Sequence, residues 1–329
     1  MPWRRLCRAR EWGLVLAVVL VVAVIAACGQ GQVFLTPFNR LNLLRQIALL
    51  GVFAVGEAVV IIAGGIDLSV GSVIGFSGMM GALLLTKLAG GQPTDQPLPA
   101  VMLLAGVGVT LLLGLLIGMF HALLVTKLQL PPFIATLSTL AGLRSAAYLV
   151  TNSNPVTLPY PNFRALSDGL TPVWFFVVAA LAVSVLMGAT TLGRSVQALG
   201  GNEEAARLSG LRVDRLKYVT YGLSGLLAAL AGVLYAAYSG QGDPRTGAGY
   251  ELQAIAAAVV GGCSLTGGVG TVSGTVLGVV LLQVVLNGIG LVIKSNSTLW
   301  QGIVTGVVVV LAVTLNNARQ RRLARSVAA

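Results

Sequence analysis

Charged residues are scarce in this sequence, and their scarcity decides the class of protein. Asp, Glu, Lys and Arg make up 9% of the 329 residues, whereas a soluble globular domain carries about 25%. Hydrophobic residues make up 56%, and the mean hydropathy is +0.89. The apolar runs are continuous, which excludes the short alternating segments of a transmembrane β-barrel. Because backbone groups in lipid must satisfy their own hydrogen bonds, we expect an all-α, polytopic membrane protein.

Reactive and metal-binding residue types are scarce as well. The single histidine, His121, lies in an apolar run and is expected to be a buried packing or hydrogen-bonded residue. Cys7, Cys28 and Cys263 lack metal or redox spacing. No glycine-rich loop ends in Gly-Lys-Ser/Thr, so the usual phosphate loop for ATP is missing. We therefore predict no catalytic residue, no metal site and no cofactor in this chain.

Ten segments are long or apolar enough to be considered as membrane helices, since a span needs about 20 residues. The eighth has only twelve residues and runs into a glycine-rich segment, so we expect a broken or half-length helix there. We predict a basic N-terminus at 1–12, a transmembrane domain at 13–315 and a basic C-terminus at 316–329. The ten segments are 13–28, 42–62, 69–86, 100–125, 132–151, 171–190, 217–239, 252–263, 271–292 and 299–315.

The N-terminal segment has two interpretations. Four arginines precede an apolar run, as in a secretory signal, and the residues 25–29, IAACG, resemble a lipoprotein cleavage site. The alternative is an uncleaved first span. We favour the second interpretation, because the rest of the chain is itself a multi-span protein and needs no separate export signal.

The distribution of positive charge predicts the orientation. With the N-terminus in the cytoplasm, the inside loops contain fourteen Lys and Arg residues and the outside loops six. This places both termini and the loop 193–217 in the cytoplasm. The net charge of +11 is then an orientation signal in contact with lipid, and we expect no nucleic-acid partner.

The stretch 194–217 is the most polar part of the chain, with eight of its 31 charged residues. Asn202 can cap a short helix, Glu203 and Glu204 suit its positive end, and Gly210 suits its left-handed end. We interpret it as an amphipathic helix outside the membrane that presents a shaped surface to a soluble partner. The alternative is a solvated loop.

Leu208 and Leu211 are three residues apart, so we expect them on one face of this helix, beside Glu204.

Two carboxylates fall in or near lipid. Glu57 lies in the second segment and Asp67 at its inner end, where a charge is costly unless it faces the bundle interior or a pathway. Glu57 is either a pathway residue or a packing residue, with Arg144 as a possible partner. Asp67 is either a pathway residue or the N-cap of the next helix.

Weaker signals come from amide and glycine residues. Gln283 and Asn287 are four apart, so they share one helix face, and they either line a hydrophilic pathway or hold two helices together. The pattern GGxxL[ST]xG occurs at 64–71 and again at 261–268. It indicates an internal repeat or a coincidence in a glycine-rich chain. Glycines spaced by four at 114–118 and 270–278 are typical of helix contacts.

Four stretches together resemble a known family, the permease subunits of bacterial ABC importers for monosaccharides, which include the ribose, xylose and autoinducer-2 systems. The likeness covers about residues 40–315. The pair GGIDLSVG and GGNEEAARLSG is its most specific part, and Asp67 favours sugar over branched-chain amino acid permeases. The stretches are IIAGGIDLSVGSVIGFSG (61–78), LPPFIATLSTLAGLRSAAYLVT (130–151), GRSVQALGGNEEAARLSGLRVDRLKYVTYGLSGLLAALAGVLYAA (193–237) and AVVGGCSLTGGVGTVSGTVLGVVLLQVVLNGI (258–289).

The resemblance implies a fold like that of type II ABC importers and a set of partners. These are a second permease subunit, identical or homologous, a cytoplasmic ATPase that binds ATP and Mg²⁺, and a periplasmic sugar-binding protein. It also implies a location in the bacterial inner membrane and the role of coupling helix for the short polar helix, while the pathway residues come from the polar positions described above. The coupling helix that contacts the ATPase comprises Asn202, Glu203, Glu204, Ala205, Ala206, Arg207, Ser209 and Gly210. The candidate substrate pathway comprises Glu57, Asp67, Ser69, Phe133, Gln283 and Asn287.

Three other functions stay open from the sequence. A self-sufficient secondary transporter would use Glu57 and Asp67 as proton or cation sites. An ABC permease for another small polar solute, such as a branched-chain amino acid or a nucleoside, would have the same plan. A membrane enzyme acting on lipid would need a polar catalytic cluster at the interface, which the sequence does not show.

Overall fold

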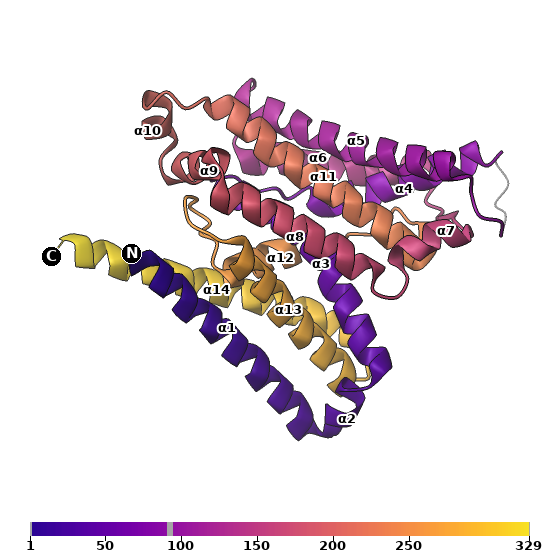
Figure 1. Cartoon of the computed structure of the whole chain (residues 1–329), viewed down its shortest axis with the longest axis horizontal. Coiled ribbons are helices and arrows are strands. Elements are labelled where there is room, and N and C mark those ends of the chain that lie inside the picture. The colour runs from indigo at the N-terminus through magenta and orange to yellow at the C-terminus, as the bar shows by residue number, and fades with distance from the viewer. Residues whose placement is uncertain (1, 91–94, 329) are drawn as a thin grey trace.

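The computed structural model describes residues 2–90 and 95–328, and the side chains of residues 11–90 and 95–314. The chain is almost entirely helical (Figure 1). Its elements are α1 Pro2–Ile25, η1 Ala26–Gln30, α2 Gly31–Phe34, α3 Pro37–Ile62, α4 Val70–Leu88, α5 Ala100–Thr126, α6 Pro132–Val150, β1 Val156–Thr157, α7 Pro161–Arg164, η2 Ala165–Ser167, α8 Thr171–Ala189, α9 Thr191–Gly201, α10 Glu203–Leu208, α11 Val213–Ser239, β2 Gln241–Gly242, α12 Tyr250–Gly261, α13 Val272–Val292 and α14 Ser297–Ala328.

The predicted all-α membrane architecture is confirmed. Within the described residues, nine helical segments are long and apolar enough to cross a membrane. The eighth predicted segment is the twelve-residue helix α12, which is too short to cross alone. Its length is about 18 Å at 1.5 Å per residue, so it crosses only together with the irregular residues 240–249 that precede it. The nine long helical segments and this shorter helix correspond to the ten segments predicted from the sequence.

Helix α11 organises one side of the bundle and α3 joins it to the other. α11 packs along α5, α4 and α3, while α3 also contacts α8, α12 and α13. Figure 1 shows α4, α5, α6 and α11 on one side and α1, α13 and α14 on the other. Every residue of α3 from Ala48 to Ile62 is buried. This part of α3 is enclosed by neighbours on all sides, which fits its apolar sequence apart from Glu57.

The spaced glycines are helix contacts, as predicted. A Cβ atom at Gly114 or Gly118 of α5 would overlap the backbone of α11 at Gly225 and Tyr221. On the other side of the bundle, Gly278 of α13 lies equally close to the backbone of α12. Small residues at these points let helix axes approach closely, which is the main source of packing energy between helices in lipid.

Replacing Gly118 by leucine is expected to force α5 away from α11. The added side chain would meet the Tyr221 carbonyl group, which a packed backbone cannot move aside. Overpacking of this kind costs about 1–3 kcal/mol, so the thermal unfolding temperature of the detergent-purified protein should fall. Gly108→Leu on the same helix is the control, because a Cβ atom there meets nothing within 4 Å. Equal unfolding temperatures for the two variants would contradict this account of the contact.

The two ends of the bundle differ. Both chain termini and α10 lie at one end in Figure 1, here called the α10 end. α2 and α7 lie toward the opposite end. A short antiparallel ribbon lies there too, since β1 closely precedes α7 in the chain. In the ribbon, Val156 of β1 pairs with Gly242 of β2. An even number of crossings before and after α10 agrees with this arrangement.

The N-terminal helix packs against the rest of the bundle. α1 contacts α13, and Ile25 lies beside Gly288. Ile25, Phe34 and Val284 form a small buried cluster between α1, α2 and α13. These contacts suit an uncleaved first span, which stays a prediction, as do the proposed domain boundaries.

Candidate functional site

The predicted short helix in the polar stretch is present as α10, and its predicted caps are confirmed. The Asn202 side-chain oxygen Oδ1 accepts a hydrogen bond from the Ala205 N–H group at 2.9 Å. Glu203 and Glu204 occupy the first turn and Arg207 the last, which complements the helix dipole. Gly210 follows Ser209 with φ +81°, a left-handed conformation that favours glycine. A rigid, well-ended helix of six residues results.

One expectation for α10 is wrong. Leu208 and Leu211 do not share a helix face, because the left-handed turn at Gly210 ends the helix between them. Leu211 turns back, and its N–H group donates to the Ala206 carbonyl oxygen at 3.1 Å. Leu211 and Ala206 pack against the core, whereas the Leu208 side chain is 84% exposed. The helix therefore presents a single large apolar side chain to the outside.

A second helix in the polar stretch was not anticipated. α9 covers Thr191–Gly201 and is capped by Thr190, whose side-chain oxygen accepts from the Gly193 N–H group at 3.3 Å. Its Val196 and Leu199 side chains are buried. The signal was available, because these two apolar residues are three apart and follow a threonine suited to an N-cap.

Ion pairs connect α10 to its neighbours. Glu203 accepts hydrogen bonds from Lys217 of α11 at 2.8 Å and from Arg207 at 3.3 Å. Arg207 and Lys127, which follows α5, both lie 3.8 Å from the Asp214 carboxylate. The charges alternate along this chain of five side chains. A network of this kind holds α10 in position more firmly than an isolated exposed pair would.

A cavity of about 570 Å³ lies behind these ion pairs. Its walls come from the loops after α3 and α5, from α10 and from the start of α11. Gly64, Gly65 and Tyr221 line it, together with the charged residues Glu203 and Lys217. Ion pairs thus connect α10 to α11, and the cavity separates part of α10 from the loops after α3 and α5.

The two GGxxL[ST]xG segments meet at the C-terminal end of α9, beside Gly200. A Cβ atom on Gly267 would touch both Gly64 and Gly200, and the Gly268 N–H group donates to the Ile62 carbonyl oxygen at 2.9 Å. The repeated pattern therefore joins the ends of α3 and α12 to α9, which directly precedes α10. The sequence did not predict that the two copies of the pattern contact each other.

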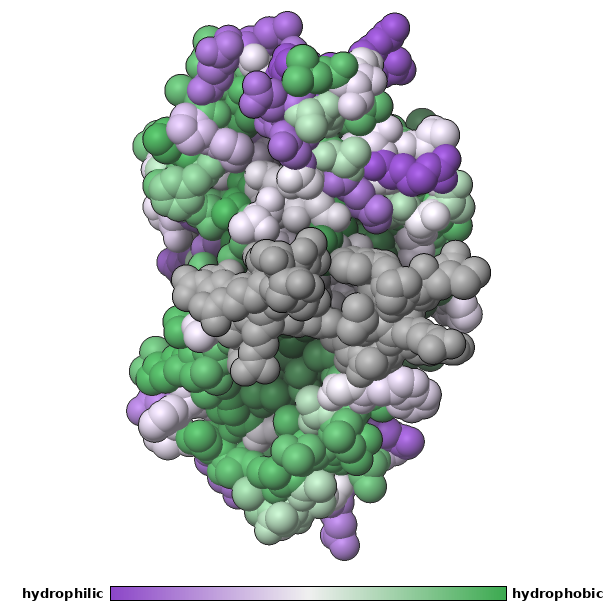
Figure 2. All heavy atoms as spheres, turned by 90° about the vertical axis from the view of Figure 1, so that its left-hand side faces the viewer, coloured by the Kyte–Doolittle hydropathy of each residue, from purple (hydrophilic) through white to green (hydrophobic). Residues whose placement is uncertain are grey.

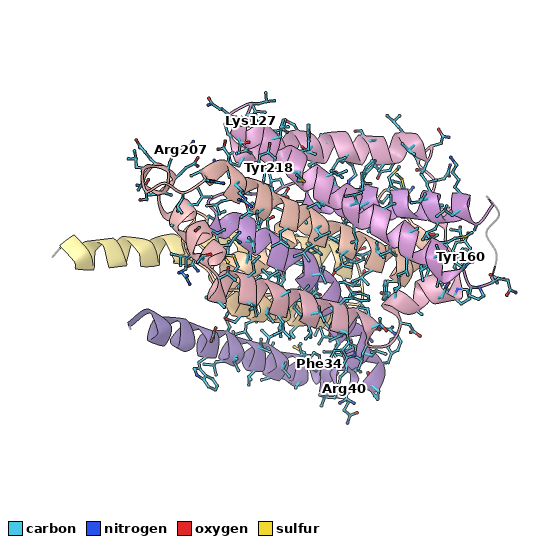
Figure 3. The ribbon with its side chains drawn as sticks, turned by 45° about the horizontal axis from the view of Figure 1, so that its top comes forward. Phe34, Arg40, Lys127, Tyr160, Arg207 and Tyr218 are labelled. Atoms are coloured by element: carbon cyan, nitrogen blue, oxygen red, sulfur yellow. The ribbon has the colours of Figure 1, made fainter. Side chains whose placement is uncertain are left out.

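Figure 2 views the molecule from the α10 end, and hydrophilic side chains gather in the upper part of this face, where α9 and α10 lie. In Figure 3, Arg207, Lys127 and Tyr218 lie at this end, while Tyr160 lies at the other. On the face shown in Figure 2, polar side chains thus surround α9 and α10.

Three of the predicted pathway residues form a buried polar cluster. Glu57 Oε1 accepts from the Asp67 N–H group at 3.2 Å. Asp67 Oδ1 accepts from the Ser69 backbone N–H at 3.0 Å and from its hydroxyl at 2.6 Å, and Asp67 Oδ2 accepts from the Ser224 hydroxyl at 3.1 Å. His121 lies 3.9 Å from Asp67 Oδ2 and 3.3 Å from the Ser69 hydroxyl.

All five side chains of this cluster are at most 1% exposed. The cluster joins α3, the loop before α4, α5 and α11. The interpretation of His121 as a buried hydrogen-bonded residue is confirmed.

Two interpretations of these charged residues are wrong. Asp67 does not cap the following helix, because the N-cap of α4 is Ser69 and Asp67 turns inward to accept from it. Arg144 is not a partner of Glu57. Its Nη1 donates to the carbonyl oxygens of Pro244 at 2.8 Å and Thr246 at 2.6 Å. The loop that brings these carbonyl groups to α6 lies a hundred residues away in the sequence.

The other predicted pathway residues lie apart from the cluster. Asn287 and Asn39 exchange side-chain hydrogen bonds of 2.9 and 3.2 Å, so Asn287 joins α13 to α3. Gln283 is 8% exposed, one turn along α13. Phe133 is 52% exposed in the first turn of α6. Among the described residues, no group of three or more His, Cys, Asp or Glu side chains could hold a metal ion.

A bundle of long apolar helices with an exposed, ion-paired helix at one end is the architecture of a multi-pass membrane protein. The protein family described as "branched-chain amino acid transport system / permease component" matches residues 39–313. The chain belongs to this permease family.

Several characterised relatives are similar over nearly the whole chain. The ribose import permease protein RbsC of Escherichia coli is 36% identical over 314 residues, which cover 93% of this chain and 93% of the relative. RbsC of Bacillus subtilis is 37% identical and covers 87% of each chain. The L-arabinose ABC transporter permease protein AraH of Azospirillum brasilense is 34% identical and covers 88% of this chain and 83% of its own. No solved structure matches the chain.

Proposed function

We propose that this chain is the membrane permease subunit of an ATP-driven importer that carries a monosaccharide inward by alternating access. It performs no chemistry itself. A partner ATPase binds ATP and Mg²⁺ and supplies the energy, and a binding protein delivers the sugar at the opposite face. A second permease subunit, either identical or homologous, completes the pathway.

The observation that carries this proposal is the form of α10. The helix is capped at both ends, ion-paired to α11 and exposed, and it offers Leu208 to a partner. A force transmitted by an ATPase needs a rigid surface of this kind, because a flexible loop would absorb the movement. We assign Asn202, Glu203, Glu204, Ala205, Arg207, Ser209 and Gly210, together with Leu208, to the contact with the ATPase. Ala206 faces inward and supports the helix.

The excess of Lys and Arg in the loops of the α10 end supports a cytoplasmic location for α10 and for both termini. The ribbon of β1 and β2 then faces the periplasm, where the sugar-binding protein docks. Inner-membrane location follows for a protein of this family.

A sugar is the best-supported substrate class. The most similar relatives reported above carry ribose or L-arabinose in their names, whereas the family description refers to branched-chain amino acids. The Asp67 of the GGIDLSVG segment, which favoured sugars in the sequence, is the centre of the buried cluster. We infer that its role is to hold the helices around the pathway in register.

Reconstitution tests the function. The permease, its ATPase and its binding protein are placed in proteoliposomes, and uptake of labelled ribose, arabinose, galactose and leucine is measured with and without ATP. We expect ATP-dependent uptake of one or more sugars and none of leucine. Leucine uptake alone would refute the sugar assignment.

Vesicles that contain the permease without its ATPase and binding protein test the ion-coupled alternative. Glu57 and Asp67, which suggested it, are hydrogen-bonded within the subunit and almost fully buried. We expect the permease alone to show no uptake under a proton or sodium gradient. Gradient-driven uptake without an ATPase would overturn the proposal.

A further inference from the structure

The segment between α11 and α12 enters the bundle beside α4 in an irregular conformation. At the ribbon end, Gly242 lies against Met79. Further along, the Thr246 carbonyl group lies against Gly75 of α4, and a Cβ atom at Gly71 would overlap the Gly247 carbonyl group. The segment therefore descends along α4 by about two turns of that helix, toward its first residues.

Helix geometry places the lower part of this segment near the middle of the bilayer. Arg144 lies twelve residues from the start of α6, or about 18 Å at 1.5 Å per residue. Tyr250 lies about 17 Å from the end of α12 by the same measure. Its ring stacks on Phe53 at 6.0 Å, about 14 Å from the end of α3. The hydrocarbon core is about 30 Å thick.

Irregular backbone at this depth must be covered by protein or must line a water-filled space, because lipid offers no hydrogen bonds. Arg245, Ala248 and Gly249 are nevertheless exposed in this chain. In other transporters, discontinuous helices with this depth and form surround the substrate. The exposed loop therefore points to a wet space that opens from the ribbon end.

Two oppositely charged side chains lie beside this loop and against the same face of α4. A Cβ atom at Gly75 would lie 3.1 Å from Arg144 Nη1, and one at Gly71 would overlap Glu251 Oε2. Both side chains are partly exposed. Arg144 uses two donors on the Pro244 and Thr246 carbonyl oxygens, of the five that a guanidinium group has. The Glu251 oxygen Oε2 is buried without a hydrogen-bond partner among the described residues. Tyr148, one turn from Arg144 and also partly exposed, adds a hydroxyl group.

We propose that Arg144 and Glu251 form a substrate-binding site in the permease, with Tyr148 at its edge, and that it takes a neutral polyhydroxylated ligand of monosaccharide size. The site rests on the proposed function and names the residues through which the sugar is held. Arg144 donates hydrogen bonds to sugar hydroxyl oxygens, and the partly exposed Glu251 carboxylate accepts from a sugar hydroxyl group. The Glu57–Asp67 cluster, by contrast, is sealed inside the subunit and positions the helices.

The charges favour a hydroxylated ligand over an amino acid. A discontinuous helix can hold a substrate carboxylate at its positive end. Glu251 occupies the first turn of α12, so it neutralises that end and repels a carboxylate there. The charges of Arg144 and Glu251 have opposite sign, so the site offers donors and acceptors without a net charge for the ligand to balance.

The test uses the complete importer in proteoliposomes with labelled sugar outside. Glu251→Gln keeps the shape of the side chain and removes its charge. We expect its initial uptake rate to fall at least tenfold, because a neutral amide oxygen accepts a weaker hydrogen bond than a carboxylate, with ATP hydrolysis still stimulated by the sugar-loaded binding protein. The ratio between the uptake rate of the sugar and that of its deoxy analogues should also become smaller. A purely structural defect would lower all of these rates together and leave the ratio unchanged. Asp168→Asn, which removes an exposed carboxylate paired with Arg45 at 3.0 Å, is the control.

A double variant separates binding from structure. Opposite charges that serve only the fold can often be replaced by apolar residues of similar volume. If Arg144 and Glu251 had only a structural role, the double variant Arg144→Met with Glu251→Leu would transport normally. We expect it to fold and to transport no sugar; normal transport would overturn the site. If Glu251→Gln does not insert, Tyr148→Phe carries the test, and unchanged uptake and discrimination would overturn the assignment. A wild-type importer that takes up no sugar would instead refute the proposed function.

Discussion

Replacing Leu208 by aspartate is expected to abolish ATP-driven uptake while the permease still inserts and folds. The side chain is 84% exposed, so the fold does not depend on it. Burying a leucine in a partner surface contributes about 2 kcal/mol, and this contribution is lost when a charge takes its place. ATPase affinity should therefore fall at least tenfold. The measurement is co-purification of the ATPase together with uptake in proteoliposomes.

Leu208→Met is the matched control, since it keeps an apolar side chain of similar volume and should retain transport. Gly210→Val provides an independent variant. It places a β-branched residue at φ +81°, which is strained, so the end of α10 should shift and ATP hydrolysis should become uncoupled from uptake. Normal coupling in both Leu208→Asp and Gly210→Val would show that α10 is not the contact with the ATPase.

Asp67→Ala is expected to produce the largest loss of stability of any single substitution considered. Asp67 is 1% exposed and accepts three side-chain or backbone hydrogen bonds from Ser69 and Ser224. Each buried polar group left without a partner costs about 1–3 kcal/mol, so the total should reach about 3 kcal/mol or more. The thermal unfolding temperature of the purified protein should fall sharply, or the protein should fail to accumulate in the membrane.

Two variants define the cause of that loss. Asp67→Asn keeps the acceptor oxygen and should be much less damaging, because Ser69 retains its partner. Asp95→Ala removes an exposed carboxylate and should have no measurable effect. An Asp67→Ala protein as stable as the Asp95→Ala protein would contradict the account of the cluster.

The local structure of α10 was predictable because its causes are local. Asn202 and Ala205 are three residues apart, so the cap depends only on the sequence between them. The same holds for the left-handed residue Gly210. Leu211 was misassigned because the effect of that left-handed turn on the following residue was not considered. α9 was missed although Thr190, Val196 and Leu199 carried the pattern.

The partners of the buried polar residues were not predictable, because they come from distant parts of the chain. Asp67 meets Ser224, which is 157 residues away. Arg144 meets the Thr246 carbonyl group 102 residues away rather than Glu57. Helix rotation decides both encounters, and a nearly uniform apolar surface carries little information about rotation.

The sequence by itself determined the membrane class, the ten apolar segments, the short eighth helix and the position of the capped polar helix α10. It could do so because hydropathy, helix length and capping act over a few neighbouring residues. Only the tertiary structure decided that Glu57 and Asp67 are enclosed, that an irregular segment descends beside α4, and that Arg144 lies near Glu251. These features depend on which helix faces meet, and close backbone contacts at glycines, rather than the order of residues in any one helix, select those faces.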